Sequence, residues 1–373
     1  MKKVLIDVNS AVIRSGSNYL SGIGRTTLDL VAALAEKQQL PFKLQLYFQN
    51  IRGNTNALDQ LNCSKLNIRL PGAEKYKNLV TKLRIKEFVS GYDVLHIPHN
   101  FDLVANPKKT IITLHDAMFF SYPEDFLGHE YARQHYPPLI KSCKAIVTCS
   151  EASKSDIVHY MNVLPENVTV IPWAVSNDFF YPESRNVIQN YLKVLKLDCP
   201  YFIMVSCDIG RKNTISLLKA YRLFLQSKPQ HNLVLVWNNP PDEILNEFST
   251  EIIKGRVKFL NGVSDKELGL LYNGATASFF PSKYEGFGLP LIESMACGTP
   301  VVTCKNSSLI EVGGDVALYT ESEDIEEMAD YMRKFEDGSF DLSKLGEESI
   351  NQANKFSWSK SADDYIRFYQ ENL

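Results

Sequence analysis

One segment of the chain combines two carboxylates with a glycine-rich turn. Residues 282–293 read SKYEGFGLPLIE and follow an apolar run, ASFFP. Gly286 and Gly288 let the backbone approach a ligand without a Cβ in the way, and the amides at the start of the next helix suit a phosphate. Glu285 and Glu293 can accept hydrogen bonds from hydroxyl groups, so the segment predicts binding of two polyols, such as a sugar and a ribose, around that phosphate. The alternative is a solvated loop with a carboxylate at a helix N-terminus.

A pair of cations follows another predicted strand. Arg211 and Lys212 come after the apolar run at 201–206. A cation at the end of a strand can neutralise the charge that builds on a departing diphosphate. The alternative for both residues is a solvated pair of charges.

Several histidines directly follow predicted strands in the first half of the chain. His115 and Asp116 follow the run TIITL directly, and we expect His96, His99 and Asn100 to line the same cleft. A histidine at this place can hydrogen-bond a sugar hydroxyl, and its backbone carbonyl can stabilise positive charge at an anomeric carbon. A metal site made of the three histidines lacks a carboxylate at a convincing ligand spacing. The chain also has no Asp-x-Asp pair, so we expect no catalytic metal.

A second glycine pair lies near the N-terminus. Gly22, Gly24 and Arg25 form a predicted loop that leads into a helix at 26–36, and backbone amides there could face a diphosphate. The pattern is not a dinucleotide fingerprint, because GIGRTT lacks the third glycine and lies well beyond the strand at 4–8. A flexible turn is the alternative for the glycines, and a surface position is the alternative for Arg25.

These residues need a scaffold, and the hydrophobic pattern predicts an α/β one. Short runs in which both the odd and the even positions are apolar alternate with longer segments whose apolar residues recur at helical intervals. This pattern indicates parallel strands covered by helices on both faces. The 373 residues exceed the roughly 250–300 that one core serves. We therefore predict two doubly wound domains, 1–185 and 186–357, with a C-terminal helix at 358–373 returning to the first. Ligands bind beyond the carboxyl ends of such strands.

Composition excludes several classes of protein. With 40 basic and 43 acidic residues the chain has no global field to attract nucleic acid. The apolar runs are too short for a membrane span, and the N-terminus reads as a first strand rather than a signal peptide. The seven cysteines form no CxxC pair, which favours buried thiols in a reducing cytoplasm.

One local segment departs from this near-neutral balance. Residues 69–86, RLPGAEKYKNLVTKLRIK, hold many cations and Glu74 as their one acid, with Leu79, Val80, Leu83 and Ile85 as an apolar set. A basic amphipathic segment of this kind could rest on anionic lipid at the inner face of a membrane. An ordinary surface helix is the alternative.

Residues 282–302, with their Glu-x7-Glu spacing, closely resemble the signature of glycosyltransferase family 4. These are retaining enzymes that use nucleotide sugars, and among them the chain resembles bacterial polysaccharide mannosyltransferases. Further segments resemble family motifs in the same order along the chain: 22–25, 93–98, 113–116, 170–172, 210–213 and 356–358. The resemblance implies the GT-B fold, in which two Rossmann-like domains face each other across a cleft. It also implies that domain 1–185 binds the acceptor and that domain 186–357 binds the nucleotide sugar.

The resemblance also implies roles for the matching residues. Glu285 would hold the donor sugar, Lys212 would contact the diphosphate, and His115 would lie beside the sugar; these are the expected catalytic residues. Glu293 would hold the ribose. The other residues expected to bind substrate are Gly22, Gly24, Arg25, His96, Asp116, Arg211, Val263, Ser264, Gly286, Phe287, Gly288 and Leu289. Val263 and Ser264 would hold the base through backbone contacts, and residues 306–308 fit a loop near the nucleotide. No metal or other cofactor is implied.

The implied reaction is transfer of a hexose from a nucleoside diphosphate sugar to a saccharide or lipid-linked saccharide in cell-surface polysaccharide synthesis. Family frequency favours GDP-mannose as donor, with a UDP-sugar second. A nucleotide-sugar 2-epimerase and a non-catalytic nucleotide-sugar-binding protein are the alternatives on this fold. The chain departs from the family at Trp173-Ala174, where Asn-Gly is usual, and at Ile209-Gly210 ahead of Arg211; a second basic position would fall near Ser206 or Cys207.

Overall fold

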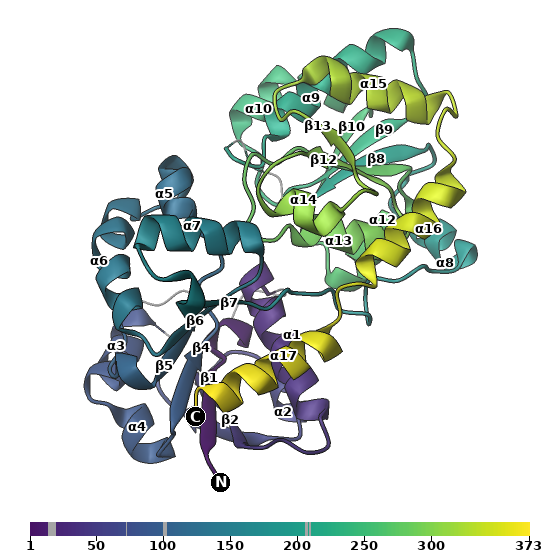
Figure 1. Cartoon of the computed structure of the whole chain (residues 1–373). Coiled ribbons are helices and arrows are strands. Elements are labelled where there is room, and N and C mark those ends of the chain that lie inside the picture. The colour runs from purple at the N-terminus through teal and green to yellow at the C-terminus, as the bar shows by residue number, and fades with distance from the viewer. Residues whose placement is uncertain (14–19, 72, 100–102, 206–207, 209) are drawn as a thin grey trace. The chain divides into compact units, whose positions relative to one another are not determined.

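The computed structural model describes residues 1–373 except 14–19, 72, 100–102, 206–207 and 209 (Figure 1). The chain forms two compact units, one made of Met1–Ala174 with Ser357–Leu373 and the other of Val175–Phe356. Each unit has its own parallel sheet and its own core. The expectations for Asn100, Ser206, Cys207 and Ile209 lie outside the described residues.

The first unit is built on a seven-stranded parallel sheet in the order β3-β2-β1-β4-β5-β6-β7. Its strands are β1 (Lys3–Asp7), β2 (Lys43–Gln49), β3 (Ser64–Ile68), β4 (Val94–Ile97), β5 (Thr110–Thr113), β6 (Ala145–Thr148) and β7 (Val168–Val170). β4 and β5 are buried along their whole length, because helices cover both faces of the sheet.

Two core clusters lie on opposite faces of this sheet. Val4 and Ile6 of β1 belong to one cluster and Leu5 to the other, as alternation along a strand requires. α1 (Gly22–Glu36) and α17 (Trp358–Glu371) pack into the first cluster, and α6 (His129–Ser142) and α7 (Glu151–Met161) into the second. The shorter helices are α2 (Asn56–Gln60), α3 (Glu74–Lys82), α4 (Ile85–Ser90) and α5 (Met118–Ser121), with 3-10 turns at Asn9–Ala11, Pro107–Lys109, Pro123–Asp125 and Pro165–Asn167.

The second unit has a six-stranded parallel sheet in the order β10-β9-β8-β11-β12-β13. Its strands are β8 (Tyr201–Val205), β9 (Asn232–Val236), β10 (Val257–Leu260), β11 (Ala277–Phe280), β12 (Val301–Cys304) and β13 (Leu318–Thr320). The helices are α8 (Arg185–Val194), α9 (Thr214–Phe224), α10 (Asp242–Glu247), α11 (Ser249–Ile253), α12 (Asp265–Gly274), α13 (Leu289–Ala296), α14 (Ser307–Gly313), α15 (Ile325–Glu336) and α16 (Leu342–Ala353), with a 3-10 turn at Leu225–Ser227. The strand order reverses between β8 and β11, and such a reversal is where open parallel sheets bind ligands.

The division between the units differs from the predicted one. The first unit ends at Ala174 rather than at residue 185, because residues 175–184 pack with the second unit. The backbone amide of Glu183 donates to Oδ1 of Asn273 at 2.8 Å, and Nδ2 of Asn273 donates to the carbonyl of Tyr181 at 2.9 Å. The C-terminal helix α17 belongs to the first unit, where the side chain of Ser357 caps its N-terminus.

Candidate active site

The loop that carries Glu285 follows β11 and leads into α13 of the second unit. It ends at Gly288, whose φ of +95° lies in the left-handed region. A Cβ at Gly288 would lie 2.8 Å from Cδ2 of Leu309, so both the backbone conformation and the space require glycine. Since β8 is the neighbour of β11, the loop after β8 meets this loop at the carboxyl edge of the sheet, and that loop carries the two cations.

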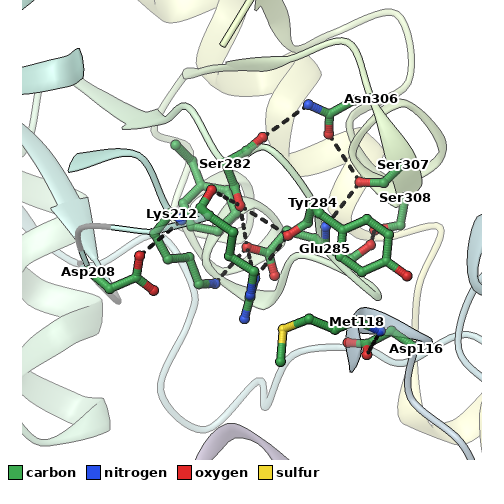
Figure 2. A network of polar contacts seen from close by, with 12 residues as sticks. Asp116, Met118, Asp208, Lys212, Ser282, Tyr284, Glu285, Asn306, Ser307 and Ser308 are labelled. Atoms are coloured by element: carbon green, nitrogen blue, oxygen red, sulfur yellow. Dashed lines mark hydrogen bonds and ion pairs between the residues drawn. The ribbon is translucent and has the colours of Figure 1, made fainter. Parts of the chain in front are cut away.

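Glu285 lies at the centre of a buried cluster of charges (Figure 2). Its Oε1 accepts hydrogen bonds from Nζ of Lys212 at 2.6 Å and from the Ser282 hydroxyl at 2.7 Å, and lies 3.0 Å from Nη1 of Arg211. Burial acts to raise the pKa of Glu285, but the two cations and these hydrogen bonds outweigh burial and hold the pKa below its usual value. The carboxyl group is therefore ionised at neutral pH, and the three charged side chains together carry one net positive charge.

Hydrogen bonds fix the backbone around Lys212 without any ligand. The Lys212 amide donates to Oδ1 of Asp208 at 3.0 Å, and the next residue, Asn213, caps α9 in the left-handed region at φ +61°. Nδ2 of Asn213 donates to the carbonyl of Pro281 at 3.2 Å, which joins this loop to the Glu285 loop. The Lys212 ammonium also lies 4.9 Å from the centre of the Phe280 ring, a favourable cation–π distance.

Arg211 ties the two loops together a second time. Its carbonyl accepts from the amide of Lys283 at 2.7 Å, and its Nη1 donates to the carbonyl of Tyr284 at 2.9 Å. Arg211 therefore shapes the loop of Glu285 as well as contributing charge. This role is neither of the two that the sequence suggested, a contact with the diphosphate or a solvated cation.

A third loop, after β12, holds the main chain of Glu285. The Ser307 hydroxyl accepts from the amide of Glu285 at 3.1 Å, and the Ser308 hydroxyl donates to its carbonyl at 2.9 Å (Figure 2). Nδ2 of Asn306 donates to the carbonyl of Ser282 at 3.1 Å. The sequence placed 306–308 near the nucleotide, and the structure shows that this loop supports the Glu285 loop directly.

The remaining residues of the segment lie beside or within α13. Glu293 lies inside the helix and is 2% exposed. Phe287 is buried with its ring centre 5.7 Å from that of Phe356, so its side chain serves packing. Gly286 is buried, and Leu289 is the first residue of the helix. Amide contacts of 286–289 with a phosphate, and a ribose contact of Glu293, stay predictions.

Ser264 has a capping role that the sequence did not assign to it. Its hydroxyl and its amide both donate to Oε2 of Glu267, at 2.6 Å and 2.9 Å, in a capping box at the start of α12. The Ser264 amide, one of the backbone groups expected at the base, is thus already engaged. Val263 precedes it in the loop after β10, and its base contact stays a prediction.

His115, in the first unit, follows β5, with its ring 5.0 Å from that of Trp173 and both ring nitrogens shielded from solvent. Neither ring nitrogen makes a well-formed hydrogen bond to a described residue. Burial lowers the pKa of His115 to about 3, with the charge of His99 acting in the same direction and the Pro98 carbonyl opposing both. The imidazole is therefore neutral. Its backbone carbonyl accepts from Sγ of Cys149 at 3.3 Å.

The structure gives the ring of His96 a packing role, and its predicted contact with substrate stays a prediction. Its ring is fully buried, with Nδ1 2.6 Å from the Tyr369 hydroxyl and Nε2 2.8 Å from the Thr113 hydroxyl. Both polar atoms are thus used to join α17 to the sheet. His99 contacts the Asp7 carboxylate at 3.0 Å instead of forming a set with His96.

The predicted glycine loop is the first turn of α1. Ser21 caps this helix by accepting from the Gly24 amide at 3.2 Å, so the helix begins at Gly22 rather than at residue 26. A Cβ at Gly24 would lie 2.5 Å from the carbonyl of Ser10, which gives this glycine a packing reason. Arg25 is half-buried in the same turn.

Asp116 is the last predicted substrate-binding residue, and a metal site is the last prediction for this region. Oδ1 of Asp116 accepts from the Met118 amide at 2.9 Å and so supports the start of α5. Among the described residues, no three His, Cys, Asp or Glu side chains gather as a metal site would need. A reaction without metal stays a prediction.

Comparisons with known proteins agree with this geometry. The model of "Glycosyltransferase Family 4" matches residues 20–179, and that of "Glycosyl transferases group 1" matches residues 192–355. O-antigen chain mannosyltransferase B of Escherichia coli is 28% identical over 94% of this chain and 96% of its own length. O-antigen chain mannosyltransferase RfbU of Salmonella typhimurium is 32% identical over a matched region that covers 61% of this chain and 60% of that relative. The solved structure of Anabaena HepE in complex with UDP and glucose superposes with a TM-score of 0.77 at 18% identity, covering all of both chains.

Two units with parallel sheets, one of which carries a Glu-x7-Glu block over a pair of cations, define a glycosyltransferase of the GT-B fold. Between them the two family models match most of the chain, residues 20–179 as a Glycosyltransferase Family 4 domain and residues 192–355 as a glycosyl transferases group 1 domain. The predicted fold class and the prediction of a transferase are confirmed.

Proposed function

We propose that the protein transfers a hexose, with retention at the anomeric carbon, from a nucleoside diphosphate sugar to a saccharide or lipid-linked saccharide in cell-surface polysaccharide synthesis. GDP-mannose is the first candidate donor and a UDP-sugar the second. The observation that carries the proposal is the buried contact of Lys212 and Arg211 with Glu285. A relative that matches over nearly its whole length is described as an O-antigen mannosyltransferase, which supports mannose and a polysaccharide product.

The charge cluster suits a diphosphate leaving group. Lys212 and Arg211 both contact Glu285, which offsets one of their two charges. A diphosphate brings further negative charge to these cations, and sugar hydroxyls can then donate to the carboxylate. Because the cations need no rearrangement as the bond to the phosphate breaks, they stabilise the growing charge on the leaving group.

His115 would act as a neutral group in this mechanism. With its pKa near 3, the imidazole cannot supply a proton at neutral pH, so general acid catalysis by this residue is not proposed. Its two ring nitrogens offer one donor and one acceptor, a pair that suits a sugar hydroxyl.

Nucleotide binding gives the first test of the proposal. GDP, UDP and dTDP are added separately to the protein and its thermal unfolding is followed; the preferred nucleotide should raise the Tm. The preferred nucleotide is then supplied as its sugar conjugate with candidate acceptors. Transfer supports the proposal, isomerisation or release of the sugar indicates the 2-epimerase or a hydrolytic relative, and binding alone indicates a non-catalytic protein. If no nucleotide raises the Tm, the proposal fails.

The same proposal includes a peripheral contact with an anionic membrane through α3 and α4. Leu79, Leu83, Phe88 and Val89 are 47%, 62%, 92% and 55% exposed, and Lys75, Lys82 and Arg84 lie on the same two helices or between them. Val80, which the sequence placed in this apolar set, is buried in the core, and the exposed residues extend beyond residue 86. Within the described residues, no helix is both long and apolar enough to cross a bilayer. The proposed location at the inner face of the membrane therefore depends on these exposed residues of α3 and α4.

Vesicle co-sedimentation tests the membrane contact. The wild type should sediment with vesicles rich in anionic lipid but not with zwitterionic vesicles. The double variant Phe88→Ser with Leu83→Ser should sediment less with the anionic vesicles. Ile253→Ser, which removes another exposed apolar side chain, from α11 of the second unit, is the matched control. Equal sedimentation of the wild type and the double variant contradicts the contact.

A further inference from the structure

The two carboxylate oxygens of Glu285 are used unequally. Oε1 accepts hydrogen bonds from Nζ of Lys212 at 2.6 Å and from Oγ of Ser282 at 2.7 Å, and lies 3.0 Å from Nη1 of Arg211 (Figure 2). No residue in the described part of the chain donates a hydrogen bond to Oε2. A carboxylate oxygen accepts about two hydrogen bonds, so Oε1 is fully engaged and Oε2 is the oxygen that can accept from a ligand.

The main chain of Glu285 is held on both sides of its Cα. The Ser307 hydroxyl accepts from its amide at 3.1 Å, and the Ser308 hydroxyl donates to its carbonyl at 2.9 Å. The remaining freedom lies in the side chain, whose last torsion has only broad intrinsic preferences. The plane of the carboxylate is therefore set by the groups that donate to Oε1.

Two of those groups serve the diphosphate as well in the proposed reaction. Lys212 and Arg211 carry full positive charges, and a diphosphate offers them several charged oxygens. Once the donor is bound, the hydrogen bonds of both cations are shared between the phosphate oxygens and Glu285. The orientation of the carboxylate then depends on a group that phosphate does not attract.

Ser282 is such a group. Its side chain is short, uncharged and fully buried, and its hydroxyl lies 3.2 Å from the carbonyl of Arg211 and 3.1 Å from that of Tyr284. A hydroxyl has one proton to donate, and the ionised carboxylate of Glu285 is the nearest and the strongest of these acceptors. The carbonyl of Ser282 accepts from Nδ2 of Asn306 at 3.1 Å, which fixes the residue itself. The Ser282 hydroxyl can therefore keep Oε1 in place while phosphate oxygens share the cations.

We propose that Ser282 is a positioning residue of the donor site, which holds Oε1 of Glu285 and thereby directs Oε2 to a hydroxyl of the donor sugar. The inference rests on the proposed function, in which this carboxylate accepts from sugar hydroxyls. It makes Ser282 a determinant of which sugar is used, whereas Lys212 and Arg211 serve the diphosphate of any donor.

Donor kinetics of Ser282→Ala test the proposal. For the preferred nucleotide sugar, kcat/KM should fall by about tenfold. The ratio of kcat/KM between that donor and a nucleotide sugar with one hydroxyl inverted should fall too, because a loosely held carboxylate discriminates less. The affinity for the nucleoside diphosphate alone, measured by calorimetry, should stay unchanged.

Two further variants define the comparison. Ser282→Cys keeps the size of the side chain and a weak S–H donor, so its kcat/KM should fall between those of the wild type and Ser282→Ala. Ser90→Ala is the matched control, because it also removes a buried hydroxyl that donates to a side-chain oxygen, Oε1 of Gln45 at 2.6 Å. Urea unfolding shows whether each variant is folded; should Ser282→Ala not fold, Ser282→Cys carries the comparison.

The outcomes separate this role from the proposed function. Transfer by the wild type with an unchanged ratio between the two donors in the Ser282 variants overturns the positioning role alone. A loss of nucleoside diphosphate affinity that accompanies the loss of kcat/KM shows that Ser282 supports the loop in general, and overturns it as well. Absence of transfer by the wild type from any nucleotide sugar overturns the proposed function, and the positioning role with it.

Discussion

Two buried polar sites follow strands in the two units, and they differ in how their polar atoms are satisfied. After β11, Glu285 contacts Lys212, Arg211 and Ser282, so each of the three charges has a partner within the protein. After β5, His115 is partly exposed, but its two ring nitrogens are buried and make no well-formed hydrogen bond to a described residue.

The difference distinguishes two ways of preparing a site. A cluster of compensated charges keeps cations in a fixed arrangement, which suits a group whose charge grows during the reaction. A neutral ring whose buried nitrogens make no well-formed hydrogen bond to a described residue has a free-energy cost that a ligand hydroxyl can remove. His96 completes the comparison, because it is fully buried and both its nitrogens are satisfied.

The largest effect is expected for Glu285→Gln. The substitution keeps the shape of the side chain but leaves Lys212 and Arg211 without a compensating charge, so kcat should fall by about 10²–10³-fold. Steady-state kinetics with the preferred donor measure the change. Glu243→Gln, at an exposed position on α10, is the control; an unchanged kcat for Glu285→Gln would show that the cluster is only structural.

Lys212→Met should reduce kcat by about 10²-fold and also weaken nucleoside diphosphate binding. The methionine keeps an apolar stem beside Phe280 but removes the ammonium that Glu285 and the diphosphate share. Calorimetry with GDP and UDP measures the affinity, and Lys254→Met, at an exposed position after α11, provides the comparison. Unaltered affinity would rule out a phosphate contact of Lys212.

Replacement of His96 and of His115 by leucine should have opposite effects on stability and on kcat. His96→Leu leaves the hydroxyls of Tyr369 and Thr113 without that partner and should lower the free energy of unfolding by about 1–3 kcal/mol, with kcat retained. His115→Leu should keep the stability and lower kcat. Urea unfolding and kinetics on both variants measure this contrast, and similar behaviour of the two variants would remove it.

Acid should weaken the fold through the same two histidines. Both have a folded-state pKa of about 3 against an unfolded value near 6.5, so the unfolded chain binds more protons between these values. Their contribution is present above about pH 6.5 and is lost as the pH falls from there toward 3. The Tm should therefore fall between pH 7 and 5, less steeply in His115→Leu; an identical slope in that variant would contradict the assignment.

Gly24→Ala should lower the free energy of unfolding by about 1–3 kcal/mol, as much as His96→Leu, but without an effect of its own on kcat. Alanine normally stabilises a helix relative to glycine, but here its Cβ would meet the Ser10 carbonyl at 2.5 Å. Thermal and urea unfolding measure the sign. A more stable variant would show that the glycine is not required for packing.

The sequence predicts the alternation of strands and helices and the position of the Glu-x7-Glu block well, because both are local. Strands buried on both faces read as apolar runs, and the glycines of 286–288 mark the turn before α13. The boundary at Ala174 was missed, because the polar stretch after it packs onto α12 through Asn273, a contact distant in sequence.

The roles of single polar side chains were harder to predict, because they depend on partners far along the chain. His96 and His115 look alike in the sequence, and the hydroxyls of Tyr369 on α17 and of Thr113 on β5, both of which contact His96, separate them. The ring contact of Trp173 with His115 has no local signal in the sequence. Ser282 was within the quoted motif, but its contact with Glu285 requires the folded loop.

The most direct test of the account is transfer itself, followed by mass spectrometry. Wild-type protein and Glu285→Gln are incubated with GDP-mannose or UDP-sugars and a manno-oligosaccharide acceptor. The account predicts an acceptor that gains one hexose with the wild type and little or no product with Glu285→Gln. Equal product from both proteins, or no transfer from any nucleotide sugar, would contradict it.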